Sequence, residues 1–293
     1  MPLPALFLFL AACSTTTDSG DTAGTDTAAD PGADSSLLGS CGGEVDDGVP
    51  EPFASWFLCS DLTVDGGSLK SHSTSLPPHP SPYYDPDNAL WVEFDEQGGD
   101  RFQNPNELSE QDMNLTIPLD PIAKGLTITT AMVDEEAGTN TEEYRGRFQG
   151  LGLDGTALFT GVAAPGDAIS EEERTFDQYE GHPTNEGVYH HHGANPSALM
   201  VLEHLGETTS TTPGSGTVEM FGIMCDGTVV LGCNELDGAS VSASALDAQG
   251  GHVGDIDSPD GESWFEDRYH VHACSALGRH LTPEIQYYEG TCG

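Results

Sequence analysis

The stretch Tyr189–His192, Tyr-His-His-His, returns near the end of the chain as Tyr269–His272, Tyr-His-Val-His. Two further elements precede each stretch in the same order. The first is Asp-Gly-Thr before an apolar pair, and the second is an aspartate followed four residues later by Gly-His. Because matched elements in one order rarely arise by chance, the sequence predicts an internal duplication, at about residues 151–195 and 222–275. The matched elements are Leu153–Phe159 with Cys225–Leu231, and Asp177–His182 with Asp247–His252.

Local geometry can be expected for both copies. Asp-Gly before apolar residues is typical of a turn that leads into a strand. On a strand, residues two apart face the same way, so the first and third histidines of each Tyr-His stretch share one face. The residue between them is His191 in one copy and Val271 in the other. An apolar valine at this place indicates that the opposite face is packed.

The recurrent histidines are candidate metal ligands. Two histidines on one strand face can chelate an ion, and a third from the Gly-His loop would complete a set suited to Zn(II) or Cu(II), with one position left for water or substrate. The aspartates before Gly-His are candidates to accept the free ring N–H groups. The predicted ligands are His182, His190, His192, His252, His270 and His272, and the predicted supporting residues are Asp177, Asp247, Tyr189 and Tyr269.

Two questions stay open from the residues alone. The copies could form one shared site or two separate ones. The histidines could instead be structural and hydrogen-bond backbone groups and tyrosines, so that they hold two halves of a β-domain together.

These motifs resemble those of the YHYH-domain proteins, an exported bacterial family that includes many lipoproteins. The resemblance covers roughly residues 70–293, and it implies that the histidines form a shared site without identifying a metal or an activity. This chain has His191 and Val271 where the signature has its second tyrosine. The motifs that carry the resemblance are Gly181–Pro183, Gly187–His192, Leu246–Asp247, Gly251–His252 and Tyr269–His272, with Leu76–His79 and Tyr287–Cys292 at the two ends.

The charge balance excludes two classes of partner. The chain has 293 residues, 49 acidic and 8 basic, and a formal net charge of −41. So few basic residues cannot form a patch that binds nucleic acid or an anionic membrane surface. The acidity fits a protein that works outside the cell, and the 36% of hydrophobic residues can still build a core.

The N-terminus indicates export. Ala5–Ala12 is wholly apolar but too short to span a bilayer, so residues 1–12 are predicted to be a signal peptide. The ending Leu10–Cys13 resembles a bacterial lipobox, which implies lipidation of Cys13 and anchoring to the outer membrane or cell surface through the lipid alone. Residues 13–40 are predicted to be a flexible acidic linker. The alternative is a buried N-terminal strand with a structural Cys13.

The other six cysteines are candidates for three disulfides in an exported chain. Among the fifteen possible pairings, the simplest joins sequence neighbours. No Cys-x-x-Cys occurs, so a thiolate zinc site is not expected. The simplest pairing is Cys41 with Cys59, Cys225 with Cys233, and Cys274 with Cys292.

Residues 41–293 are predicted to form one mostly β domain, internally duplicated and β-sandwich-like, with one or two short helices. Alternating apolar residues predict strands at Leu90–Phe94, Met113–Leu119, Leu126–Ile128 and Val218–Met224. A helix is expected from Asn195 as the cap and Pro196 as the first residue to a stop at Gly206.

Three functions remain possible from the sequence. The leading hypothesis is a tethered lipoprotein that binds Cu or Zn. The second is a metal-dependent hydrolase or oxidase that uses the same histidines. The third is a non-catalytic module that binds Ca²⁺ through acidic loops, of which Asp255–Glu262 is the best candidate although it lacks EF-hand spacing. No nucleophile elbow, phosphate loop or dinucleotide fingerprint occurs.

Overall fold

The computed structural model describes Leu38 and residues 41–133 and 140–292. The predicted signal peptide, Cys13 and nearly all of the predicted linker lie outside the described residues. In the part of the chain that is described, no helix is long and apolar enough to cross a membrane. The chain is mostly β, as predicted, and its strands form two sheets. A sandwich-like packing of the sheets stays a prediction.

The smaller sheet has three antiparallel strands in the order β1-β2-β3. Its strand β3 lies where the alternation predicted a strand. Met113, Leu115 and Ile117 are buried while the residues between them are exposed or half-buried. The strands are β1 (Asp61–Asp65), β2 (Ser68–Ser73) and β3 (Met113–Pro118).

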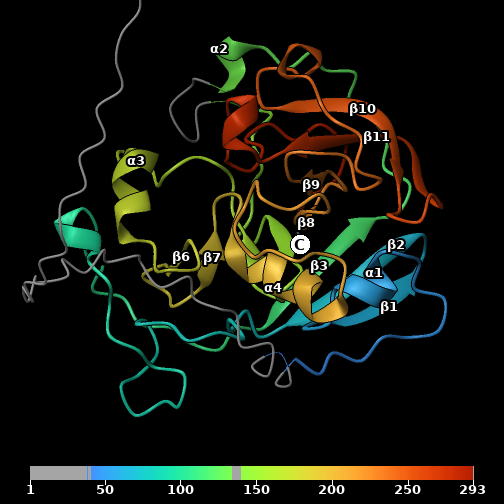
Figure 1. The fold of residues 1–293 in the computed structure, drawn as a ribbon. Coiled ribbons are helices and arrows are strands. Elements are labelled where there is room, and N and C mark those ends of the chain that lie inside the picture. Colours follow the sequence, from blue (N-terminus) through green and yellow to red (C-terminus); the bar gives the residue numbers. More distant parts are fainter. Residues whose placement is uncertain (1–37, 39–40, 134–139, 293) are drawn as a thin grey trace, which may run out of the picture. The chain divides into compact units, whose positions relative to one another are not determined.

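The larger sheet has eight strands in the order β10-β11-β9-β8-β4-β5-β7-β6. In Figure 1, its labelled strands run from β10 and β11 through β9 and β8 to β7 and β6. Its central strands β4 and β8 pair antiparallel. Outward from this pair, both halves repeat an antiparallel, a parallel and an antiparallel pairing. Each copy of the sequence repeat therefore supplies four strands with the same connections. The strands are β4 (Gly150–Gly152), β5 (Ala157–Leu158), β6 (Gly181–Pro183), β7 (Tyr189–His191), β8 (Met220–Met224), β9 (Val229–Leu231), β10 (Gly251–Asp257) and β11 (Ser263–His272).

The one long helix, α4 (Pro196–Leu205), agrees with its prediction. Asn195 Oδ1 accepts a hydrogen bond from the Ala198 N–H at 2.8 Å, and Gly206 ends the helix in the left-handed region at φ 82°. The other described helices are single turns, more numerous than expected. They are α1 (Phe53–Trp56), α2 (Thr130–Val133) and α3 (Ile169–Glu172), with the 3-10 turns η2 (Gln97–Gly99), η3 (Glu173–Thr175), η4 (Ala243–Ala245) and η5 (Ser275–Leu277).

Two predicted strands are wrong. Residues Leu126–Ile128 form no strand, and Ile128 instead packs in a small apolar cluster with Val133 and Ile285. Within Leu90–Phe94, only Trp91 makes a single bridge, to Ser81, and this residue is 40% exposed. Apolar alternation indicates a buried face, but a strand also needs a neighbour that pairs with its backbone.

One hydrophobic core joins both sheets and α4. It contains Leu69 and Ile117 from the smaller sheet, Leu151 and Val230 from the larger one, and Leu199 from α4, all essentially inaccessible to solvent. Burying each such side chain contributes roughly 1.5–3 kcal/mol. The larger sheet is therefore held on a rigid base.

The Asp-Gly-Thr elements form turns before β5 and β9, as predicted. In the first copy, Asp154 Oδ1 accepts hydrogen bonds from the N–H and the hydroxyl of Thr156, at 3.1 and 2.8 Å. In the second, Asp226 accepts the same pair from Thr228 at 2.9 and 3.2 Å. Both aspartates are fully buried. Because both copies form the same hydrogen bonds from threonine to aspartate, the Asp-Gly-Thr element occurs in each of them.

A tyrosine and an aspartate fasten the outer strand pair in each copy. The Tyr189 hydroxyl donates to Asp177 at 2.9 Å, and the Tyr269 hydroxyl donates to Asp247 at 2.7 Å. The aspartate N–H also donates to the carbonyl of the glycine before the Gly-His histidine, at 2.9 and 2.8 Å. We call this arrangement the Asp–Tyr clasp.

Each Gly-His pair needs a glycine because a tyrosine ring packs directly against its Cα atom. The Tyr189 ring lies over Gly181 and the Tyr269 ring over Gly251, so a Cβ at either glycine would overlap the tyrosine hydroxyl. The Asp-x-x-x-Gly-His and Tyr-His-x-His elements are therefore parts of one packing unit.

All six cysteines after Cys13 pair, which indicates an oxidising, extracellular or periplasmic setting. The prediction was correct for Cys41–Cys59 and wrong for the other four, which form Cys225–Cys292 and Cys233–Cys274. The physical reason is the sheet. Parallel pairing of β9 with β11 brings the chain after Leu231 beside the chain after His272, and the disulfide joins them there.

We expect Gly251→Ala to destabilise the protein by about 1–3 kcal/mol, because the new methyl group must displace the buried Tyr269 ring. Urea unfolding followed by circular dichroism measures this change. Gly42→Ala is the matched control, since nothing lies within 4 Å of a Cβ at that position. Equal unfolding midpoints for the two variants would contradict the packing unit.

A second prediction concerns pH. Burial raises the pKa of Asp177 to about 6, although hydrogen bonds from Ser81, the Tyr179 N–H and Tyr189 oppose the shift. A folded-state pKa above the unfolded value of 3.8 means that wild type loses stability as pH rises from about 4 to 6. Asp177→Asn, an uncharged isostere, is expected to match wild type near pH 4 and to exceed it at pH 7 by up to about 3 kcal/mol. Urea unfolding in metal-free buffer at several pH values tests this, and parallel curves would refute it.

Candidate metal centres

The first histidine cluster lies at one end of the larger sheet. His182 on β6 stands directly opposite His190 on β7, and His192 follows two residues after His190. The Nε2 atoms of His182 and His190 are 3.1 Å apart, and those of His190 and His192 are 2.9 Å apart. All three side chains are buried, and their ligand atoms lie within 4.8 Å of one another. The histidines therefore converge on one point.

The opposite ring nitrogen of each histidine is fixed. Nδ1 of His190 lies 3.1 Å from the Val188 carbonyl oxygen, and Nδ1 of His192 lies 2.6 Å from the Thr160 carbonyl oxygen. A carbonyl only accepts, so both Nδ1 atoms carry the proton. His182 Nδ1 donates to Thr175 Oγ1 at 2.6 Å, because the threonine hydroxyl itself donates to the Glu172 carbonyl. All three Nε2 atoms thus present lone pairs to the same point.

This arrangement favours a bound cation. Burial and the neighbouring rings hold the pKa of His182 and His190 well below the usual range, and burial lowers that of His192 to about 4. Neutral rings with protonated Nδ1 atoms cannot donate hydrogen bonds to one another through Nε2. Lone pairs about 3 Å apart repel unless a positive centre lies between them. A divalent metal with imidazole affinity would supply such a centre.

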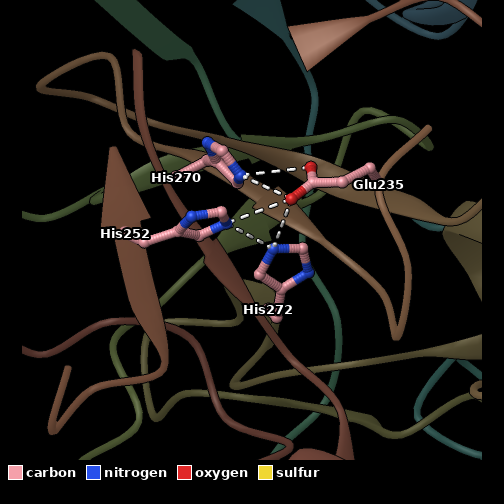
Figure 2. Close-up of side chains that lie close together, drawn as sticks. All are labelled: Glu235, His252, His270 and His272. Carbon is pink, nitrogen blue, oxygen red and sulfur yellow. Dashed lines mark hydrogen bonds and ion pairs between the residues drawn. The ribbon is translucent and has the colours of Figure 1, made fainter. Parts of the chain in front are cut away.

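The second cluster repeats this geometry and adds a carboxylate (Figure 2). His252 on β10 faces His270 on β11, and Nε2 of His252 lies 3.2 Å from Nε2 of His272. The Glu235 carboxylate points among the rings, with oxygen-to-Nε2 distances of 3.1 Å to His252, 3.2 Å to His270 and 3.5 Å to His272.

The ring tautomers of His270 and His272 match those of His190 and His192. His270 Nδ1 donates to the Arg268 carbonyl at 3.0 Å, and His272 Nδ1 donates to the Gly232 carbonyl at 2.8 Å. Burial alone would raise the pKa of Glu235, but the close contacts of its carboxylate with the three histidine rings hold this pKa well below its usual range. The second cluster therefore offers three imidazole nitrogens and one ionised carboxylate oxygen, the number and the kinds of ligand atoms that a four-coordinate zinc site uses.

The surroundings of the clusters differ. A cavity of about 800 Å³ is lined by all three histidines of the first cluster and by no ligand of the second. The Phe159 ring also lines it and stacks on His190, with ring centroids 3.9 Å apart. Glu172 reaches the first cluster through His192 at 3.4 Å, and burial raises its pKa. The first cluster is thus open to ligands.

A third group unites His79, Asp154 and His191, all fully buried. His191 Nε2 lies 3.3 Å from Asp154 Oδ2, which also accepts a 2.5 Å hydrogen bond from the Ser197 hydroxyl. Although burial opposes both shifts, this pairing raises the pKa of His191 and holds that of Asp154 below its usual range. The Asp154 oxygens are already occupied by protein donors, so we interpret the group as a buried ion pair that joins the Asp-Gly-Thr turn, β7 and α4.

The six predicted ligand histidines thus fall into two separate groups. The described hydrogen bonds of Asp177 and Asp247 go to the clasp tyrosines and to backbone and hydroxyl groups, whereas backbone carbonyls accept the Nδ1–H groups of four cluster histidines. A supporting role of the two aspartates at the ring N–H groups stays a prediction. The accepting carbonyls belong to Val188 and Arg268, two residues before His190 and His270, and to Thr160 and Gly232, which follow β5 and β9. Tyr189 and Tyr269 belong to the same clasp.

Sequence analysis missed Glu235 and the buried pair of His191 with Asp154. Glu235 has no counterpart in the repeat and is one of many acids, so no pattern singles it out. The candidate calcium turn Asp255–Glu262 lies in the β10–β11 hairpin, where Ser258 and Glu262 bond each other. Among the described residues, no candidate metal group includes its acids.

Comparison with known proteins supports the resemblance. The sequence profile described as YHYH protein matches residues 116–270, more than half of the chain, and this segment includes five of the six cluster histidines. No curated protein and no solved structure matches the chain significantly. On the strength of this match, the chain belongs to the YHYH protein family.

Proposed function

We propose that this protein binds two transition-metal ions per chain, Zn(II) or Cu(II), one at each histidine cluster. The observation that carries the proposal is the convergence of three Nε2 atoms in each cluster, with the Nδ1–H groups of His190, His192, His270 and His272 held by backbone carbonyls. Fixing the tautomer and the ring orientation in advance lowers the cost of assembling a metal site. A structural role for the histidines alone does not account for unshared lone pairs that face one another.

The donor chemistry selects the class of metal. Imidazole nitrogens suit Zn(II) and Cu(II), whereas Ca²⁺ takes oxygen ligands, so calcium does not fit either cluster. Ligand spacing also fits, because a pair of histidines two apart on a strand and a third directly opposite can reach one ion.

Export and anchoring form the second part of the proposal. Three disulfides support an oxidising compartment, and the lipobox-like segment before Cys13 supports attachment to the outer membrane or cell surface through a lipid. The net charge of −41 repels nucleic acid and anionic membrane surfaces. We therefore propose contact with the membrane through the lipid anchor alone and no binding of nucleic acid.

The metal content of protein purified without a histidine tag tests the central proposal. We expect two Zn or Cu ions per chain by elemental analysis after equilibrium dialysis. His190→Ala with His192→Ala is expected to remove one ion, and His270→Ala with His272→Ala to remove the other. His204→Ala is the matched control, since this exposed histidine belongs to neither cluster. Equal metal content in wild type and both double variants would end the proposal.

The Cys233–Cys274 disulfide generates another prediction. It closes the loop that carries Glu235 onto the strand that carries His272. Replacing both cysteines by serine is expected to weaken metal binding about tenfold at the second cluster and to leave the first unchanged, because the Glu235 loop loses its fixed position. Competition with a chromophoric chelator measures both affinities. The Cys41→Ser, Cys59→Ser variant is the control, and equal weakening in both variants would contradict the prediction.

A further inference from the structure

The two copies of the repeat supply different numbers of ligands. In the second cluster, the atoms that lie within 4.8 Å of one another come from three histidines and Glu235. In the first cluster, they come from three histidines alone. Glu172 does not complete this set, because its described contact with the cluster is to His192 only and its other oxygen accepts the Ala164 N–H at 3.2 Å.

The matched backbone shows where the missing ligand would be. Thr160 and Gly232 are equivalent, since their carbonyls accept the Nδ1–H of His192 and His272 respectively. Glu235 stands three residues after Gly232, and Ala163 stands three residues after Thr160. Ala163 lines the cavity together with the cluster histidines. A short methyl group thus stands at the position where the other copy has a carboxylate.

The cavity indicates what takes the free position. Its volume of about 800 Å³ is large enough for a small organic molecule, and Phe159 and Pro165 give it apolar walls. The charged side chains that line it are Glu143, Asp167 and Glu172 against Arg145. This balance disfavours a polyanion such as a phosphate ester.

We infer that the copies have diverged into a closed metal site at the second cluster and an open one at the first, where a small molecule with one oxygen or nitrogen donor and at most one negative charge binds the metal through the cavity. This inference rests on the proposed function. Glu172, next to His192, is placed to accept a hydrogen bond from that ligand.

Azide binding to the protein loaded with two Cu(II) ions tests the inference, because azide bound to Cu(II) has a strong charge-transfer band. We expect one azide per chain. The band should persist in the His270→Ala, His272→Ala variant and vanish in the His190→Ala, His192→Ala variant. Inorganic phosphate at the same concentration should leave the band unchanged.

Two reciprocal variants make the test sharper. Ala163→Glu supplies the missing carboxylate and is expected to keep two metal ions but to lose azide binding at least tenfold. Glu235→Ala opens the second cluster and is expected to bind two azides. Folding of both variants is checked by thermal unfolding, and metal content is measured on the same samples.

The outcomes separate the two proposals. A wild-type protein that holds two Cu(II) ions but binds no azide, or binds two, overturns the open and closed assignment and leaves metal binding intact. The open and closed assignment is also overturned if Ala163→Glu holds two metal ions and binds azide as wild type does. Displacement of azide by phosphate overturns it as well. A wild-type protein without metal overturns both proposals.

Discussion

The Asp–Tyr clasp is the interaction on which both histidine clusters depend. In each copy, a buried tyrosine hydroxyl bonds an aspartate across a glycine that leaves room for the ring. The clasp fixes the register of two antiparallel strands on the face away from the histidines. Because a slip of one residue would turn every side chain to the other face, this register keeps three histidines together.

Duplication explains the remaining order of the larger sheet. Each copy makes a turn with a buried aspartate, a parallel crossover and an antiparallel outer pair, and the copies join through β4 and β8. A motif that fastens one strand pair thereby builds a cluster at each end of the sheet order. Among the differences between the copies, Ala163 stands where the other copy has Glu235, and only the second cluster includes a carboxylate.

Backbone carbonyls accept the ring N–H groups of four cluster histidines, a role that sequence analysis expected of the aspartates. A carbonyl such as that of Val188, two residues before His190, accepts the ring N–H without any requirement on its own side chain. Sequence patterns record side chains, so they cannot show a partner that any residue would provide. The clasp aspartates are visible in the sequence for another reason, because the tyrosine hydroxyls bond a side-chain acceptor at these positions.

The sequence by itself determined the duplication, the strands β3 and β8, the helix α4 with its cap, the Cys41–Cys59 pair and the six histidines. Each of these depends on local pattern or on side chains close in the chain. Only the tertiary structure decided that the histidines form two groups, that Glu235 completes one of them, and that Cys233 pairs with Cys274. These features join residues that the parallel strands β9 and β11 bring side by side. The spacing of residues along the chain does not determine the order of strands in a sheet.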